Sequence, residues 1–397
     1  MENDSSSTWD NWFLDEVSAL REKKLLRRLT PVDSEADTKV TINGKTLLAF
    51  CSNNYLGLTN HPDLKAAAIA AIQTWGVGTG ASRLISGNIR LYEMLENEVA
   101  RFKLCDHAVV FSSGYAANVG ALSAIIGEAD LVLFDRLNHA SLLDGVRLSG
   151  GRLRVYRHKD MEQLRALLGK RAAQQKAIIV TDGIFSMDGD IAPLPEIVAL
   201  AGQYDAIIYL DDAHATGVLG KTGRGTCEHF GIKSDRMIQM GTFSKALGGL
   251  GGFVAGSSSL IQFLINKARS LIYTTALPPA VLATATAALQ LIQNDSGRKE
   301  RLWANTNRLR QAVTDLGFCV GSSETPIIPL IVKDADKAVA ASSMLLEEGI
   351  YLPAIRPPTV PKGQARLRAT LMATHSPEQI GYLIEKLEKV GCALGII

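Results

Sequence analysis

The sequence has little charge of either sign in excess and no long apolar run. It has 397 residues, with 42 Lys and Arg against 40 Asp and Glu, and its net charge is +2. No block of like charge is long enough to follow a phosphate backbone. A membrane helix needs about 20 consecutive apolar residues, and no segment approaches that length. We therefore expect no nucleic acid and no membrane as a partner.

Cysteine is also scarce. The five cysteines are far apart and odd in number, and none forms a C-x-x-C pair, which argues against a disulfide framework and against a thiolate metal or redox site. Residues 1–7 are acidic and polar, whereas a signal peptide begins basic and then becomes apolar. These features predict a cytoplasmic protein with reduced thiols and no metal.

The composition that remains is that of a globular protein, with 47% hydrophobic and 21% charged residues. Its length exceeds one typical domain. We expect an N-terminal arm over 1–61, formed by an amphipathic helix over 8–29 and a β-hairpin turning at Asn43-Gly44. A large domain is expected over 62–290. A smaller α+β domain follows over 291–397 and ends in a helix that Ser376, Pro377 and Gln379 begin with a capping box.

The large domain alternates short apolar runs with helical segments. Continuous apolar runs are typical of strands buried on both faces of a parallel sheet, so we predict an α/β fold with a mostly parallel central sheet and helices on both faces. In such sheets ligands bind beyond the carboxyl ends of the strands. The runs are Ala108–Phe111, Leu131–Phe134, Ala177–Val180, Ala206–Leu210, Met237–Met240 and Gly252–Ala255.

Two strand ends carry a carboxylate and a lysine. Asp211 follows one run directly, with His214 close behind, and a buried carboxylate needs a positive partner such as a protonated pyridine nitrogen. Lys245 follows another run and precedes a glycine-rich stretch, so it is a candidate Schiff-base amine. Thr242 and Ser244 lie where hydroxyls can hold a phosphate.

Three further strand ends carry polar residues. The small residues before and after Gly114 read as a turn into a helix, whose free N–H groups suit a phosphate. His139 follows the next strand, where an imidazole can stack on a flat ring, and Ser186 follows another. Each residue alone is more often a helix cap, a structural histidine or a solvated lysine. The prediction rests on their occurrence at the ends of successive strands.

The pattern Asp211-x-x-His214 and Thr242-x-x-Lys245, with Phe185-Ser186-Met187-Asp188-Gly189-Asp190 upstream, resembles the α-oxoamine synthase family of fold-type I pyridoxal-phosphate transferases. The likeness covers nearly the whole chain. Three segments, Gly80–Gly87, Asp135–Ser141 and Ile355–Pro361, most resemble the members that join L-alanine to a pimeloyl thioester in biotin synthesis. Asn54 departs from the family, where an aspartate is expected in many members.

The resemblance implies a cofactor, pyridoxal 5'-phosphate, and roles for individual residues. Lys245 is expected to carry the cofactor as a Schiff base and to move the substrate proton. The other implied roles are Asp211 on the pyridinium nitrogen, His139 stacked on the ring, His214 on its phenolic oxygen, Ser186 beside the ring, Gly114, Tyr115 and Thr242 on the phosphate, Thr275 across a homodimer interface, Arg368 on the amino-acid carboxylate, and Arg27 and Thr359 on the acyl substrate.

Three alternatives stay open. Sister enzymes, 2-amino-3-ketobutyrate ligase and 5-aminolevulinate synthase, use glycine with acetyl-CoA or succinyl-CoA, and one methyl group separates glycine from alanine. A nucleotide-binding oxidoreductase is suggested by Gly76–Ala81, which matches G-x-G-x-x-A but follows a helical run over 64–75. A catalytically silent partner subunit is the third alternative, and the presence of both Lys245 and Asp211 argues against it.

Overall fold

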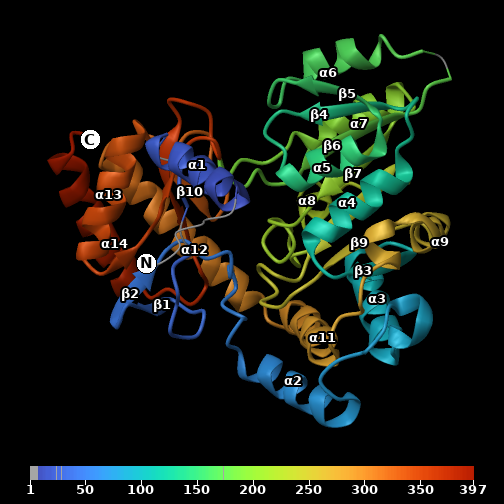
Figure 1. The fold of residues 1–397 in the computed structure, drawn as a ribbon, viewed down its shortest axis with the longest axis horizontal. Coiled ribbons are helices and arrows are strands. Elements are labelled where there is room, and N and C mark those ends of the chain that lie inside the picture. The colour runs from blue at the N-terminus through green and yellow to red at the C-terminus, as the bar shows by residue number, and fades with distance from the viewer. Residues whose placement is uncertain (1–7, 24, 28, 173) are drawn as a thin grey trace.

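A seven-stranded sheet flanked by helices makes up the larger part of the computed structural model, which describes residues 8–23, 25–27, 29–172 and 174–397 (Figure 1). The sheet order is β3-β9-β8-β7-β6-β4-β5, and only β9 runs antiparallel to its neighbours. The strands are β3 (His107–Phe111), β4 (Leu131–Asp135), β5 (Arg152–Tyr156), β6 (Ala177–Asp182), β7 (Ile207–Asp211), β8 (Met237–Thr242) and β9 (Gly252–Gly256).

The predicted fold class is confirmed, and all six predicted runs are strands of this sheet. The continuous apolar pattern indicates that a strand is buried on both faces, but it does not indicate the direction of the strand. The strand β9 has this pattern and runs antiparallel to both of its neighbours. The strand β5 was not predicted from the sequence. That strand lies at the sheet edge and alternates arginine with apolar residues, so it has no continuous apolar run.

Helices cover both faces of the sheet. Side chains of α4, α5, α9 and α10 share one core with the sheet, and those of α6 and α7 share another on the opposite face. These helices and their neighbours are α2 (Pro62–Trp75), α3 (Arg90–Lys103), α4 (Gly114–Ile125), α5 (Ala140–Ser149), α6 (Met161–Leu168), α7 (Leu194–Gln203), α8 (Thr226–His229), α9 (Ser258–Lys267), α10 (Arg269–Ile272) and α11 (Pro279–Asn294), with one π-helical turn at Arg83–Gly87.

The remaining elements form a smaller body from both ends of the chain. The predicted hairpin exists, with Asn43 and Gly44 at positive φ, and β11 extends it into a three-stranded sheet. A second sheet has the order β10-β13-β12. The strands and helices are β1 (Lys39–Ile42), β2 (Lys45–Ala49), β10 (Ile327–Lys333), β11 (Ile350–Tyr351), β12 (Ala354–Ile355), β13 (Ala365–Thr370), α12 (Ser296–Asp315), α13 (Ala335–Glu347) and α14 (Pro377–Ala393).

Both predicted terminal helices are present, but they differ in how well the sequence placed them. The capping box of Ser376 and Gln379 begins α14 as expected. The first helix, α1 (Thr8–Glu22), is shorter than the predicted 8–29 and buries no residue. A helix that buries no residue gains little from packing to offset the entropy cost of further turns. Residues 1–7 lie outside the described residues, and the domain boundaries after 61 and 290 stay a prediction.

Candidate active site at the carboxyl edge of the central sheet

The candidate residues lie at one edge of the sheet because parallel strands end there together. Asp182 at the end of β6 is in register with Asp211 at the end of β7, and β7 pairs in turn with β8. The loops that follow these strands carry Ser186, His214 and Lys245. Chain direction alone therefore gathers polar residues that are far apart in sequence.

Asp211 is buried among neutral donors. Its Oδ2 accepts a hydrogen bond from Asn118 Nδ2 at 2.7 Å, and its Oδ1 accepts one from the Ala213 backbone N–H at 2.9 Å. The Tyr209 hydroxyl donates to Asn118 Oδ1 at 3.0 Å and so fixes which way the amide points. Only 3% of Asp211 is exposed. A buried carboxylate held only by neutral groups can accept a cationic donor at this edge.

Lys245 lies in the loop after β8 and is partly exposed. Burial of its ammonium group lowers its pKa, while the charges of Asp211 and Asp182 oppose that shift and Arg368 adds to it. A lowered lysine pKa increases the fraction of neutral amine, which is the form that acts as nucleophile or base. Lys245 is thus both near the carboxylates and prepared for amine chemistry.

Two imidazoles face this cluster, and both are neutral near pH 7. Burial lowers the pKa of His139, against the attraction of Asp211. Burial also lowers the pKa of His214 well below its usual value, and Lys245 and Arg368 add to that shift. His214 Nδ1 lies 2.8 Å from the hydroxyl of Tyr55. Neutral rings add no positive charge against the lysine and leave the carboxylates to balance the cations.

A glycine contact shapes the side of the site where α4 begins. The Ser113 hydroxyl caps the helix by accepting from the Ala116 N–H at 3.0 Å, and a Cβ added to Gly114 would lie 3.4 Å from Thr242. A Cβ on Gly252 would lie 2.7 Å from the Gly114 Cα, so this glycine allows the backbones to approach. The first N–H groups of α4 remain available to an anion.

Two predicted phosphate residues have other partners. Thr242 Oγ1 donates to the Gly251 carbonyl at 2.7 Å and lies 2.6 Å from Ser244 Oγ. Tyr115 is exposed, and its hydroxyl donates to Asp144 at 2.6 Å. The Thr242 hydroxyl must turn away from the Gly251 carbonyl to donate to a phosphate, whereas the Tyr115 ring stands at the surface.

Arg368 reaches the site from the C-terminal sheet. It lies on β13, is only 8% exposed, and its Nε donates to the Ser186 carbonyl at 2.5 Å. Its Nη2 lies 3.3 Å from Asn53 Oδ1, and its charge acts on both Lys245 and His214. No carboxylate pairs with Arg368 among the described residues. The guanidinium can therefore receive the carboxylate of a small substrate.

Three predicted residues do not join the cluster. Thr275 is exposed and forms an isolated β-bridge with Ser82. Thr359 is exposed in a turn where its N–H donates to the Arg356 carbonyl, and Arg27 is exposed beyond the end of α1. Among the described residues no hydrogen bond or ion pair connects these three to Lys245. Their predicted roles involve a second subunit or the acyl substrate, and they stay predictions.

Sequence reasoning missed several groups in the site. Asp182 follows a predicted strand, so the same strand-end argument could have found it. Asn118 lies one helical turn beyond Gly114, which is a weaker signal. Tyr55 and Asn53 flank Asn54 in a segment compared with the family, but no role was predicted for them, since their partners lie 159 and 315 residues away. Asn54 caps its own turn, with Oδ1 2.9 Å from the Leu58 N–H, so its departure from the family is satisfied locally.

Other features of the described chain point away from this edge. A cavity of about 740 Å³ opens where β8 begins, at the opposite edge from Lys245, and is lined in part by Lys103, Cys105, Cys227 and Arg236. Among the described residues no group of His, Cys, Asp and Glu could hold a metal ion. None of the helices that the structure describes is long and apolar enough to span a membrane. A dinucleotide fingerprint must follow a strand, whereas Gly76–Ala81 follows the helix α2.

Comparison with known proteins adds the family. The model of the aminotransferase class I and II family matches residues 45–387. An 8-amino-7-oxononanoate synthase of Geobacter sulfurreducens is 48% identical and covers 96% of this chain and 98% of its own. A solved structure of SPT, serine palmitoyltransferase, with a PLP internal aldimine has a TM-score of 0.93 at 31% identity, covering 99% of this chain and 100% of its own. An 8-amino-7-oxononanoate synthase structure from Francisella tularensis has a TM-score of 0.76 at 29% identity, covering 88% and 99%.

Proposed function

Since this chain belongs to the class I and II aminotransferase family, and within it to the 8-amino-7-oxononanoate synthases, we propose that it condenses L-alanine with a pimeloyl thioester. The reaction releases carbon dioxide and the thiol and forms 8-amino-7-oxononanoate for biotin synthesis in the cytoplasm. The observation that carries this proposal is the position of Asp211 and Lys245 at and beyond the ends of the neighbouring strands β7 and β8, in a chain nearly half identical to such synthases over almost its whole length.

Pyridoxal phosphate is the cofactor, and the residues at the sheet edge fit it. Among the described residues Asp211 receives hydrogen bonds only from neutral donors and so suits a pyridinium nitrogen, while the start of α4 at Gly114 suits the phosphate. Lys245 is the amine that holds the cofactor, and His139 lies where it can stack on the ring. When bound, the cofactor supplies an electron sink for the charge that develops on the amino-acid α-carbon.

The side chains divide the remaining work. Arg368 binds the alanine carboxylate and so orients the α-carbon toward Lys245. The Lys245 amine, whose pKa burial lowers, takes the α-proton and later returns one to the product. Asp211 keeps the cofactor nitrogen protonated, His214 bonds the phenolic oxygen, Thr242 serves the phosphate and Ser186 helps to place the ring. Arg27 and Thr359 meet the acyl substrate at the surface.

We also propose that the chain works as a homodimer. Large apolar side chains are exposed on α1 and near the Ser82–Thr275 bridge, which is unusual for a surface that stays wet. Thr275 next to this surface can reach the cofactor phosphate of the other subunit. Sedimentation of the purified chain tests the assembly. The exposed side chains include Trp9 at 72%, Trp12 at 51%, Phe13 at 55%, Val77 at 78%, Ile85 at 81% and Tyr273 at 71%.

Thiol release by the pyridoxal-phosphate-loaded protein tests the function. The panel pairs L-alanine with pimeloyl-CoA, glycine with acetyl-CoA or succinyl-CoA, and L-serine with palmitoyl-CoA. We expect release with alanine and pimeloyl-CoA, and mass spectrometry of the product should identify 8-amino-7-oxononanoate. Lys245→Ala should abolish turnover, whereas Lys267→Ala, the same change at an exposed lysine on α9, should not.

Each other outcome of the panel has a definite meaning. Release only with glycine would keep the cofactor and Lys245 but assign a glycine-using sister activity. Release only with serine would assign the acyl transfer named for the structural neighbour. No release with any pair, by protein that binds the cofactor, would favour a silent subunit.

A further inference from the structure

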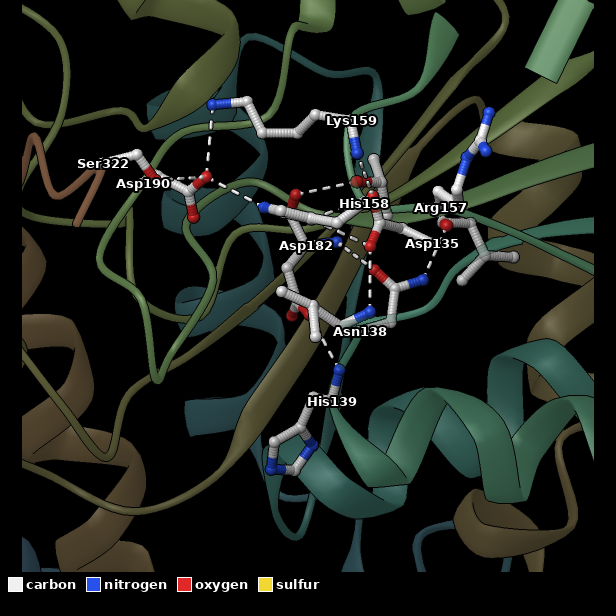
Figure 2. Close-up of polar contacts among 12 residues, drawn as sticks. Asp135, Asn138, His139, Arg157, His158, Lys159, Asp182, Asp190 and Ser322 are labelled. Carbon is white, nitrogen blue, oxygen red and sulfur yellow. Dashed lines mark hydrogen bonds and ion pairs between the residues drawn. The ribbon is translucent and has the colours of Figure 1, made fainter. Parts of the chain in front are cut away.

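His158 lies just beyond β5, between two buried carboxylates (Figure 2). Its Nδ1 is 3.0 Å from Asp135 Oδ1 and 3.1 Å from Asp135 Oδ2, and its Nε2 is 2.9 Å from Asp190 Oδ2. Asp135 and Asp190 are each 1% exposed. The Phe185 ring packs nearly perpendicular to the imidazole, with the ring centroids 4.4 Å apart. None of the roles proposed above uses this histidine.

The geometry requires a charged imidazole. A neutral histidine has one N–H, so its other nitrogen would direct a lone pair at a carboxylate, whereas an imidazolium donates to both. Burial opposes the charge, but the hydrogen bonds to Asp135 and Asp190 outweigh burial and raise the pKa of His158 to about 9. Lys159 adds a second cation, with Nζ 3.2 Å from Asp190. Its φ of 56° is a strained conformation for lysine, held by the N–H bond to Asp135.

On one side His158 fixes the loop that carries His139. The Asp135 carboxylate also accepts from the Leu137 backbone N–H at 2.9 Å, so its orientation sets the first turn of that loop. Asn138 Nδ2 then donates to the Val180 carbonyl at 2.7 Å. The His139 N–H donates to Asp182 at 2.8 Å. Successive residues of the loop are thus each held by a hydrogen bond, and His158 orients Asp135, which makes the first of these bonds.

On the other side His158 fixes the turn that carries Ser186. The Phe185 N–H donates to the Asp190 carbonyl at 3.0 Å and closes this turn. Ser322 Oγ lies 3.4 Å from Asp190 Oδ2, which links the turn to the smaller body. Arg368 donates to the Ser186 carbonyl within the same turn. A displacement of Asp190 would therefore move the contact of Arg368 as well.

We propose that His158 is a positioning residue that, as an imidazolium between Asp135 and Asp190, fixes the His139 loop relative to the Ser186 turn. This inference rests on the proposed function, because His139 orients the cofactor and Arg368 the amino acid. The bridge sets the relation between those two binding elements without touching either ligand. Errors of about 1 Å in such relations cost about 100-fold in rate.

The charged groups that face the bridge predict its pH dependence. Asp135 and Asp190 balance His158 and Lys159, and Asp182 also acts on Asp135 through the sheet. Tyr156 stays neutral, because burial and Asp135 raise its pKa well above the usual value. When pH rises through about 9, His158 loses its proton and one carboxylate faces a lone pair. The bridge is therefore intact while pH stays well below 9 and is lost as pH rises through about 9. Its contribution to the free energy of unfolding is complete only below 6.5, the ordinary histidine pKa, and is lost over the same rise through about 9.

The first test needs neither cofactor nor substrate. NMR of histidine-labelled protein follows the His158 imidazole, assigned by its loss in His158→Gln. We expect the imidazole to titrate near pH 9 and to titrate at least one unit lower in Asp190→Asn, which removes one acceptor. His107→Gln makes the same change at an exposed histidine at the start of β3 and should leave this resonance unmoved. Titration of His158 near pH 6.5 in the unaltered protein would overturn the proposal.

The second test asks whether the bridge positions the site. In pyridoxal-phosphate-loaded His158→Gln, at full cofactor occupancy, we expect altered visible circular dichroism and a drop of about 10- to 100-fold in kcat/KM for alanine. In the unaltered protein and in His107→Gln, kcat/KM for alanine should fall as pH rises through about 9. In His158→Gln this alkaline fall should be absent. If His158→Gln fails to fold, Asp190→Asn provides the test, and its alkaline fall in kcat/KM should move to lower pH. An alkaline fall at an unchanged pH in Asp190→Asn would refute the positioning role of His158.

The two proposals fail in different ways. Suppose that the protein releases no thiol with any substrate pair, but that Asp190→Asn shifts the His158 titration and His158→Gln alters the dichroism. That result would refute the proposed function and support the positioning role of His158. A protein that makes 8-amino-7-oxononanoate, with His158→Gln identical to His107→Gln in dichroism and kcat/KM, would sink the bridge alone.

Discussion

Two adjacent carboxylates at the end of β7 have opposite surroundings. Asp212 pairs with Lys103 at 2.9 Å, both side chains are fully buried, and the Thr226 hydroxyl donates to Asp212 at 2.6 Å. Asp211 next to it receives hydrogen bonds only from the neutral donors Asn118 and Ala213 among the described residues. One carboxylate is already neutralised by the protein, and the other keeps its charge for a ligand.

The difference shows how a strand end can serve stability and chemistry at once. Consecutive residues near a strand end point to opposite sides, so a pair of aspartates can be divided between two environments. Lys103 also donates to the Arg224 carbonyl at 2.5 Å, which ties the Asp212 side into the surrounding loops. The Asp211 side faces Lys245 and His139. Stability should therefore depend on Asp212, and activity on Asp211.

The largest effect that this comparison predicts is on folding. Lys103→Met removes the cation and leaves the Asp212 carboxylate buried and unpaired, which should lower the free energy of unfolding by about 3 to 5 kcal/mol. Urea unfolding measures the loss. The kcat of the folded fraction should change by less than a few fold, since Lys103 does not reach the candidate site.

A second variant separates the charge effect from a packing defect. In Lys103→Met with Asp212→Asn the buried charge is gone, so part of the lost stability should return. A double variant as unstable as the sum of its single variants would mean that the ion pair contributes nothing specific. The two sides of β7 would then not differ as proposed.

The next effect is on catalysis. Asp211→Asn removes the charge that keeps the cofactor nitrogen protonated, and we expect kcat to fall by about 10²- to 10³-fold at saturating cofactor. The free energy of unfolding should fall by about 1 to 3 kcal/mol, less than in Lys103→Met, because the hydrogen bond from Asn118 is lost but no buried charge is left without its cation and repulsion with Asp182 is relieved. Steady-state kinetics and urea unfolding of the same preparation check both values. A stability loss like that of Lys103→Met would contradict the comparison.

The smallest effect comes from a buried histidine whose two ring nitrogens bond backbone groups. His375 Nδ1 accepts from the Met372 N–H at 2.9 Å, and Nε2 lies 3.0 Å from the Ala49 carbonyl, so the ring is neutral with its proton on Nε2. Burial lowers the pKa of His375 from 6.5 to about 4. Below pH 6.5 the unfolded chain binds a proton that the folded chain excludes, so stability falls as pH falls.

Urea unfolding at pH 7 and pH 5 measures this contribution. The fall in unfolding free energy between the two pH values should be about 2 kcal/mol larger in the unaltered protein than in His375→Gln. His229→Gln, at an exposed histidine on α8, is the control and should match the unaltered protein. An equal pH dependence in all three would mean that His375 is not excluded from protonation.

The sequence predicted the elements that depend on neighbouring residues. The hairpin turn at Asn43-Gly44 and the cap at Ser376 are local patterns, and both are present. The six apolar runs are strands of the central sheet, and the predicted site residues follow five of them. The edge strand β5 and the early end of α1 were not predicted. A short stretch of sequence does not show that a strand will lie at a sheet edge or that a helix will bury no residue.

By itself the sequence determined the fold class, the family and the strand end at which Lys245 lies, because apolar runs and turn residues act over a few positions and family motifs are read in order. Only the tertiary structure decided the partners. Asn118 meets Asp211 across 93 residues, Lys103 meets Asp212 across 109, and the Asp135–His158–Asp190 bridge joins three separate loops. Such contacts depend on which side chains the packed sheet brings within about 3 Å, and no short-range pattern specifies that distance.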